Sequence, residues 1–319
     1  MQHPAAYVID RSTRRSRFPR LAMLAIMIGL LLGGSLLAAT HRSPTKEGTV
    51  KSIRVRGGGC ALPWTKSVTD GAGVTTTLDL CLPPEGNLTA LSYPHTAAAD
   101  QQLSFDAYCL SYQTPQRGPV TAAADFGGAA GTPASFGFGP ATISEPGGPN
   151  TNPITVTRST TDGKFQVSEY IKVNVVPRSI AVVVTIKNTS GVTQNFFYER
   201  AVAPKIGGDA GNDQYNVFDR DSVGAPTAAQ VFDSSGTQSL VVSVASNTLT
   251  QDPQVLLDPR ADWLTNASGG GDYPCDGANW DASGPVSGGN RVVVARALRT
   301  TAGLANNATA KITYDFRLL

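Results

Sequence analysis

Histidine is scarce in this chain of 319 residues, with only three copies. His3 and His41 lie on either side of a hydrophobic run, which leaves His95 alone in the rest of the chain. A Ser-His-Asp triad would have to use His95, and no G-x-S-x-G motif supplies its nucleophile. The phosphate-binding G-x-x-x-x-G-K-[ST] loop and the dinucleotide-binding G-x-G-x-x-G motif are also missing. These absences predict that the chain is not an enzyme.

Charge is also sparse, since Asp, Glu, Lys and Arg make up only 16% of the residues. The chain has 26 basic and 24 acidic residues and no basic run interleaved with aromatic residues, so we expect no nucleic-acid partner. Glycine and proline are abundant, at 33 and 21 copies, and this composition is typical of loop-rich β structure.

The uncharged run Leu21–Ala39 follows a basic segment, residues 1–20, that contains five arginines. Basic flanks stay on the cytoplasmic side of a membrane, so we expect the N-terminus inside and the rest of the chain outside the cytoplasm. The run is long for the core of a signal peptide and just short of a membrane span. Two alternatives stay open: a retained single-pass membrane anchor, or a signal peptide cleaved near Ala39 to give a secreted protein.

Residues 40–59 read as a linker that ends in three glycines. We expect a small N-terminal β portion over 60–117, a Gly/Pro/Ala-rich loop or boundary over 118–153, and the main β domain over 154–319. Beyond the leader, no stretch has a convincing helical period. The fold class that follows is all-β, an antiparallel β-sandwich preceded by one N-terminal hydrophobic helix.

Short segments in which apolar and polar residues alternate carry this prediction, because alternation with turn residues at both ends is typical of strands. The segment Ser179–Lys187 is apolar on both faces at its centre and predicts a strand covered on both sides. The other predicted strands are Val74–Leu82, Leu103–Tyr112, Ile154–Arg158, Phe165–Asn174, Gln194–Ala201, Gln214–Asp219, Ser239–Ala245, Arg291–Arg299 and Thr309–Leu318.

The four cysteines are Cys60, Cys81, Cys109 and Cys275. An even number in an exported chain favours two disulfides over a metal site, and no C-x-x-C motif is present. Three connectivities are open. Local pairs close with the least loss of chain entropy, which favours Cys60–Cys81 together with Cys109–Cys275.

The segment Ile180–Val202, IAVVVTIKNTSGVTQNFFYERAV, resembles the hairpin of bacterial cell-envelope modules of the immunoglobulin-like β-sandwich type. A strand ends there in a V-T-I-x-N-T-S-G turn, and the next strand carries Y-x-R. The closing segment, Gly303–Phe316, is similar to the last hairpin of such modules. The resemblance implies a β-sandwich and a role in spacing, adhesion or ligand presentation, and it implies no site residue.

Calcium is the one cofactor that the sequence suggests. Carboxylate and amide oxygens on a tightly turning segment suit this ion, and Asp276, Asn279 and Asp281 supply them around Gly277. A second acidic loop, Gly207–Asp213, has a similar composition. The alternative is that both are ordinary turns, because Asp, Asn and Gly are the residues that turns use.

Aromatic residues gather near the same acidic loop, at Trp263, Tyr273 and Trp280. Exposed aromatic rings stack on sugar rings, so these residues are candidates for a glycan-binding surface. The alternative is that they fill the core.

The sequence therefore predicts an exported or membrane-anchored cell-envelope protein with a non-catalytic structural or interaction role. Its partners would be the membrane, through Leu21–Ala39, and an unknown protein or glycan. The alternative is a carbohydrate-binding or carbohydrate-active extracellular protein.

Overall fold

The computed structural model describes residues 46–47, 60–88, 90–92, 103–114, 121–126, 135–206, 213–220, 226–233, 236, 238–246, 254–259, 286–287 and 291–319. These residues belong to one compact unit, Thr45–Leu319. The hydrophobic helix predicted over Leu21–Ala39 lies outside them. Within the described ranges, no helix has the length and hydropathy of a membrane span.

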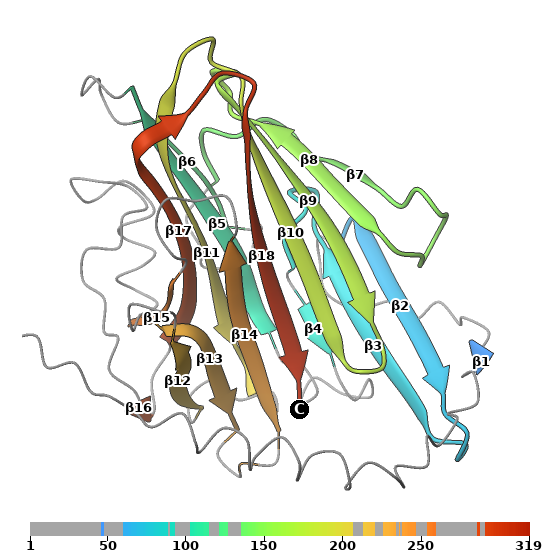
Figure 1. Cartoon of the computed structure of the whole chain (residues 1–319). Helices are drawn as coiled ribbons and strands as arrows, with labels where there is room; N and C mark the ends of the chain where they lie inside the picture. Colours follow the sequence, from blue (N-terminus) through green and yellow to red (C-terminus); the bar gives the residue numbers. More distant parts are fainter. Residues whose placement is uncertain are drawn as a thin grey trace, which may run out of the picture. The chain divides into compact units, whose positions relative to one another are not determined.

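The described residues form almost only strands, which confirms the predicted all-β class (Figure 1). The strands are β1 (Lys46–Glu47), β2 (Leu62–Thr69), β3 (Thr75–Leu82), β4 (Ala90–Ser92), β5 (Leu103–Gln113), β6 (Thr121–Asp125), β7 (Thr142–Ser144), β8 (Ile154–Ser159), β9 (Phe165–Asn174), β10 (Ser179–Asn188), β11 (Gln194–Pro204), β12 (Gln214–Arg220), β13 (Pro226–Phe232), β14 (Ser239–Ser246), β15 (Gln254–Pro259), β16 (Val286–Ser287), β17 (Arg291–Leu304) and β18 (Thr309–Leu318).

The strands form three antiparallel sheets. The four-stranded sheet has the order β1-β2-β3-β4, and the five-stranded sheet has the order β15-β17-β11-β5-β6. The nine-stranded sheet has the order β16-β12-β13-β14-β18-β10-β9-β8-β7. β5 therefore lies beside β11, although about eighty residues separate them in the chain.

Strict alternation sets the two faces of the nine-stranded sheet. Along β9, β10 and β18, buried positions alternate with partly or fully exposed ones, because successive side chains of a strand point to opposite faces. Val182 at the centre of β10 is buried and lies opposite Ile171 of β9 and Tyr314 of β18. One face of this sheet is therefore apolar and the other meets solvent.

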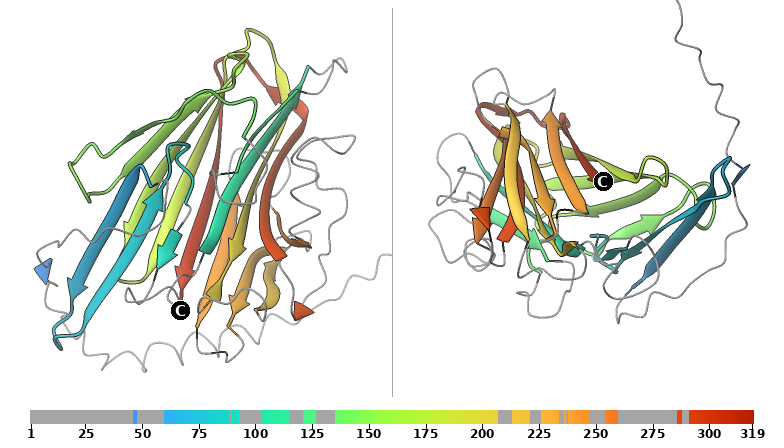
Figure 2. Two further views of the ribbon diagram at one scale, coloured as in Figure 1. Left: turned by 180° about the vertical axis from the view of Figure 1, so that it is seen from behind. Right: turned by 90° about the horizontal axis from the view of Figure 1, so that it is seen from below.

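The apolar face packs against the other two sheets, which lie behind it in Figure 1 and in front of it in the reverse view of Figure 2. Tyr198 of β11 lies 6.4 Å from Tyr314 of β18, measured between ring centroids. On the side of the four-stranded sheet, the backbone nitrogen of Thr65 donates to Asn150 Oδ1 at 2.9 Å. Buried side chains from all three sheets belong to a single hydrophobic cluster.

Every strand predicted from alternation is present, with bounds shifted by a few residues. The sequence did not predict eight strands: β1, β2, β4, β6, β7, β13, β15 and β16. Six of these have six residues or fewer, and β6, with the sequence TAAAD, is rich in alanine, which is depleted in strands. β6 and β7 lie within residues 118–153, and the domain boundaries of the sequence analysis stay a prediction.

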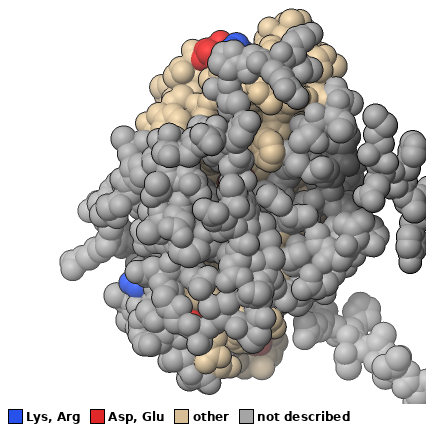
Figure 3. All heavy atoms as spheres, turned by 90° about the vertical axis from the view of Figure 1, so that its left-hand side faces the viewer, with Lys and Arg blue, Asp and Glu red and all other residues tan. Residues whose placement is uncertain are grey.

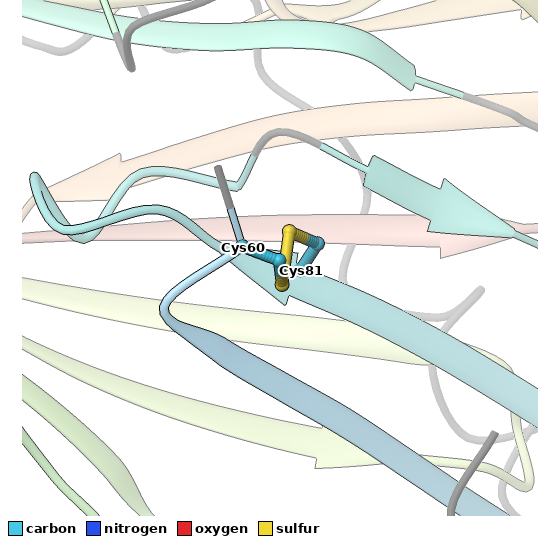
Figure 4. Close-up of a disulfide and its surroundings, with 2 residues drawn as sticks. All are labelled: Cys60 and Cys81. Atoms are coloured by element: carbon cyan, nitrogen blue, oxygen red, sulfur yellow. A yellow bond between two sulfur atoms is a disulfide. The ribbon is translucent and has the colours of Figure 1, made fainter. Parts of the chain in front are cut away.

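A disulfide joins Cys60, just before β2, to Cys81 on β3, as predicted (Figure 4). The two Cα atoms are 5.5 Å apart and 21 residues apart in sequence, so the bond closes the β2–β3 hairpin at its open end. Cys109 on β5 is also disulfide-bonded. Its predicted partner, Cys275, lies outside the described residues, so the Cys109–Cys275 pair stays a prediction.

The first prediction concerns this hairpin. Replacing both cysteines, Cys60→Ala with Cys81→Ala, releases a loop of about twenty residues in the unfolded chain. We expect the free energy of unfolding to fall by about 3 kcal/mol, because the bond restricts the unfolded ensemble. Urea unfolding followed by circular dichroism measures the change. An unchanged midpoint would show that the hairpin is held by its packing alone.

Candidate functional site

The residues that the sequence analysis selected for binding lie outside the described residues. They are the aromatic candidates Trp263, Tyr273 and Trp280 and the calcium candidates Asp276, Asn279 and Asp281. Of the other acidic loop, Asp213 is described: it is buried, and its Oδ2 accepts a hydrogen bond from the backbone nitrogen of Ile206 at 3.2 Å. Among the described residues, no group of three or more His, Cys, Asp and Glu could hold a metal ion.

Charged side chains lie where the two larger sheets face each other. We call this group the buried ion-pair layer. Its members are Asp106 on β5, Asp125 on β6, Arg158 on β8, Glu169 on β9 and Arg200 on β11, each no more than 6% exposed. Carboxylates and guanidinium groups lose their hydration when they are buried, which costs free energy. Close pairing between the opposite charges is needed to offset that cost.

Arg200 holds the centre of the buried ion-pair layer. Its Nε donates to Asp106 Oδ1 at 2.7 Å, and its Nη2 donates to the other carboxylate oxygen of Asp106. Nη1 lies 3.2 Å from Glu169 Oε1, on the facing sheet. One guanidinium group therefore pairs with a carboxylate of its own sheet and with a carboxylate of the opposite sheet.

Arg158 makes the second connection between the sheets. Its Nη1 forms an ion pair with Asp125 and donates to the hydroxyl of Tyr108 at 3.1 Å. Nη2 donates to the backbone oxygen of Gly139 at 2.8 Å. The guanidinium carbon lies 4.7 Å from the ring centroid of Phe138, within the range of a cation–π contact. Arg158 thus extends from β8 to β6 of the five-stranded sheet.

Charge in this layer is unbalanced, with three carboxylates against two guanidinium groups. Burial raises the pKa of Glu169, and it outweighs the opposing attraction of Arg200. Burial likewise raises the pKa values of Tyr108, Tyr198 and Tyr314, which surround the pairs, so these phenols stay neutral. The raised pKa of Glu169 means that this carboxylate takes up a proton more readily than an exposed glutamate does.

The buried ion-pair layer is closed to large ligands. Glycoside hydrolysis, for example, requires two carboxylates on either side of a bound sugar. Asp106 is fully buried and Glu169 is 3% exposed, and both oxygens of Asp106 contact Arg200. The arrangement holds two sheets together, and it does not present carboxylates to a polymer.

The opposite, outward face of the nine-stranded sheet is open to solvent. Tyr170 lies midway along β9, the third strand from one edge of the sheet, and 47% of its surface is exposed. It lies directly opposite Thr155 of β8 and Val183 of β10, and Val183 in turn lies opposite Thr313 of β18. An exposed aromatic ring on a sheet face can stack on the apolar face of a ligand, and the hydroxyl groups beside the ring can hydrogen-bond to the ligand's polar edge.

Polar side chains continue the outward face on both sides of Tyr170. Thr157 Oγ1 lies 3.3 Å from Ser168 Oγ, and Ser144 Oγ lies 2.6 Å from Thr155 Oγ1. We call the outward-facing side chains of β8, β9, β10, β18 and β14 the Tyr170 face. It is the described surface that best combines an aromatic ring with hydrogen-bonding groups.

The sequence analysis missed both groups of residues. A signal for the buried ion-pair layer was present, since Glu169 falls in register with the apolar positions Phe165, Val167, Ile171 and Val173 of its strand. A carboxylate in an apolar row predicts a buried partner. Tyr170 gave no comparable signal, because an exposed aromatic residue in a strand can also pack against a neighbouring part of the chain.

No protein-family model matches the chain, and no curated protein is similar to it in sequence. Its structure is similar to that of a bacterial glucoamylase in complex with acarbose, with 10% identity and a TM-score of 0.45. That match covers 86% of this chain and 34% of the glucoamylase, so the chain spans about a third of that protein's length.

Two further similar structures match nearly in full. One is described as a "Putative aldose 1-epimerase" from Escherichia coli K12, with 9% identity and a TM-score of 0.39; the match covers 76% of this chain and 96% of that one. The other is the Slr1438 protein of Synechocystis sp. PCC 6803, with 10% identity and a TM-score of 0.39; the match covers 84% of this chain and 99% of that one.

These likenesses correct one prediction. The expectation that the chain is not an enzyme is contradicted, because two of the structures named above are described as enzymes, a glucoamylase and a putative aldose 1-epimerase. None is described as an immunoglobulin-like module, so that resemblance stays a prediction. With TM-scores below 0.5, the likenesses bring no reaction and no site residue to this chain.

The second prediction tests the buried ion-pair layer. In Arg200→Ala, Asp106 and Glu169 are left buried without their cation, so the free energy of unfolding should fall by about 3–5 kcal/mol. Arg317→Ala is the matched control: Arg317 is exposed and lies 3.4 Å from Asp315, and its loss should cost about 0.5 kcal/mol or less. Chemical unfolding measures both. Equal losses would mean that the buried pairing adds nothing.

The third prediction is a pH dependence that Glu169 causes. Because its pKa is raised in the folded chain, the folded state holds this proton more tightly than the unfolded state does. Its contribution to stability is therefore complete below the unfolded pKa and is lost as the pH rises through the folded value, by up to about 1.4 kcal/mol per pH unit.

Glu169→Gln removes this titration while keeping the shape of the side chain. The stability of the variant relative to the unmodified chain should increase as the pH rises above about 4.5, the ordinary value, and then level off. Urea unfolding at a series of pH values measures the difference. A difference that stays constant with pH would rule out a raised pKa at Glu169.

Proposed function

We propose that this chain is a carbohydrate-binding or carbohydrate-active protein that works outside the cytoplasm. The segment Leu21–Ala39 would hold it at the membrane, or would be removed on secretion. The Cys60–Cys81 disulfide supports this location, because disulfides persist in oxidising compartments and are rare in the cytosol.

The observation that carries the carbohydrate proposal is the Tyr170 face. Sugars present apolar ring faces and many hydroxyl groups, so their sites combine aromatic side chains with hydrogen-bonding ones. Tyr170 supplies the ring, and Thr155, Ser168 and Thr313 supply hydroxyl groups on the same face. The open face of a sheet suits an extended polysaccharide chain better than it suits a small molecule, which needs a concave site.

The loop aromatics Trp263, Tyr273 and Trp280 belong to the same proposal as a second contact region. The calcium candidates Asp276, Asn279 and Asp281 would order that loop. Both stay predictions from the sequence, and the experiment below does not depend on them.

The fourth prediction tests the proposal at Tyr170. We expect the full-length protein to bind polysaccharides, and we expect Tyr170→Ala to weaken that binding about tenfold, as loss of about 1.4 kcal/mol requires. Tyr170→Phe keeps the ring and should retain most of the affinity. Affinity electrophoresis or biolayer interferometry against a panel of neutral and anionic polysaccharides measures the effect.

Val74→Ala is the control for exposed apolar surface. Val74 is 61% exposed and lies in the β2–β3 turn, on another sheet, so its loss should leave polysaccharide binding unchanged. The proposal is wrong if no polysaccharide binds, or if Tyr170→Ala binds as tightly as the unmodified protein does.

A further inference from the structure

The Tyr170 face carries an excess of positive charge. At the described outward positions of its strands, the basic side chains are Lys172 on β9, Lys187 on β10, and Lys311 and Arg317 on β18. The acidic side chain at these positions is Asp315. β8 and β14 contribute only Thr, Ser, Val and Ala to the same face.

These charges surround Tyr170 in the register of the sheet. Lys172 is the next outward residue along β9, about 7 Å from Tyr170 between Cα atoms. Lys187 lies opposite Gln166, two outward positions from Tyr170 in the other direction. Because β9, β10 and β18 are neighbours, about 4.8 Å apart from strand to strand, all four cations fall within one continuous surface. Figure 1 looks onto these strands.

In the view from the left-hand side of Figure 1, a few described charged side chains of both signs lie at the surface (Figure 3). On the Tyr170 face, Arg317 forms an ion pair with Asp315, with 3.4 Å between Nη2 and Oδ2. Lys172 is therefore the cation best placed to act on a ligand at Tyr170, and Lys311 and Lys187 lie farther away on the same face.

We propose that the Tyr170 face takes an anionic polysaccharide, one whose sugars carry carboxylate or sulfate groups. This inference rests on the proposed function and deepens it by naming the class of ligand. Tyr170 stacks on a sugar ring, the threonine and serine hydroxyl groups bond to its edge, and the lysines pair with the acidic substituents.

Charge complementarity along a polymer is the physical reason to expect an anionic polysaccharide on this face. A single exposed ion pair contributes little, about 0–1 kcal/mol, so one lysine and one acid group do not make a site. A polymer with an acid group on each repeat meets several of these cations at once, and the gains add without a new loss of translational freedom. Such binding weakens with salt, because exposed charges are screened.

Bare cationic attraction would also draw an anionic membrane to this face. The exposed ring of Tyr170 and the row of hydroxyl groups beside it favour a carbohydrate, because a sugar offers both an apolar ring face for stacking and many hydroxyl groups for hydrogen bonds. A membrane is therefore treated as an outcome of the experiment.

The experiment compares ligands of different charge on the full-length protein. Biolayer interferometry is run with polygalacturonate and heparin as anionic probes, dextran and starch as neutral probes, and phosphatidylglycerol vesicles as the membrane probe. We expect the anionic polysaccharides to bind about tenfold or more tightly than the neutral ones at low salt, and to lose this advantage as sodium chloride is added.

Variants then separate a site from general attraction. Lys172→Gln with Lys187→Gln should weaken binding to the anionic polysaccharides about tenfold, and Tyr170→Ala should do the same. Lys66→Gln with Lys205→Gln is the matched control, because it removes the same charge from β2 and from the residue that follows β11. It should leave binding unchanged.

Each result decides the question. Neutral polysaccharides that bind through Tyr170 as tightly as anionic ones would overturn this inference and leave the proposed function standing. Equal weakening by the two double-lysine variants would also overturn it, since binding would then follow net charge. If no polysaccharide binds, the proposed function fails as well, and binding to the vesicles alone would assign the face to a membrane.

Discussion

The pairing of Arg200 with Asp106 and Glu169 is the constraint on which the two larger sheets depend. The guanidinium group comes from β11, and its two partners come from β5 of the same sheet and β9 of the facing sheet. Burying these groups costs free energy, and replacing such a triad with apolar residues can leave a protein as stable or more stable. Once they are buried, however, each needs the others, so the triad fixes how the sheets face each other.

The same constraint gives the nine-stranded sheet two different faces. Period two sends Glu169 inward to Arg200, and it sends Tyr170 and Lys172 outward to solvent. A slip of one residue in the pairing of β9 would bury Tyr170 and Lys172 and expose Glu169. Ion pairing inside therefore helps to define the surface outside, and the chemistry of the two faces follows from one register.

Much of the fold could be predicted from the sequence, because a strand with one covered face shows a local alternation of apolar and polar residues. Phe165–Asn174 and Thr309–Leu318 are strands with the bounds that their alternation indicates. β6 was missed, since its sequence TAAAD is mostly alanine, which is depleted in strands, and β15 was missed because it is only six residues long. The buried ion-pair layer was harder to predict from the sequence. Glu169 could be recognised as a carboxylate in an apolar row, but its partner Arg200 lies in another strand and another sheet.

The sequence by itself determined where the chain forms strands, which face of each strand is apolar, and that Cys60 and Cys81 are close enough along the chain to pair. These properties depend on neighbours a few residues apart. Only the tertiary structure decided that β5 lies beside β11 and β14 beside β18, that Arg200 reaches Glu169, and that Tyr170 and the lysines share one open face. These properties join segments far apart in the chain, and no local pattern records which distant strands will pair.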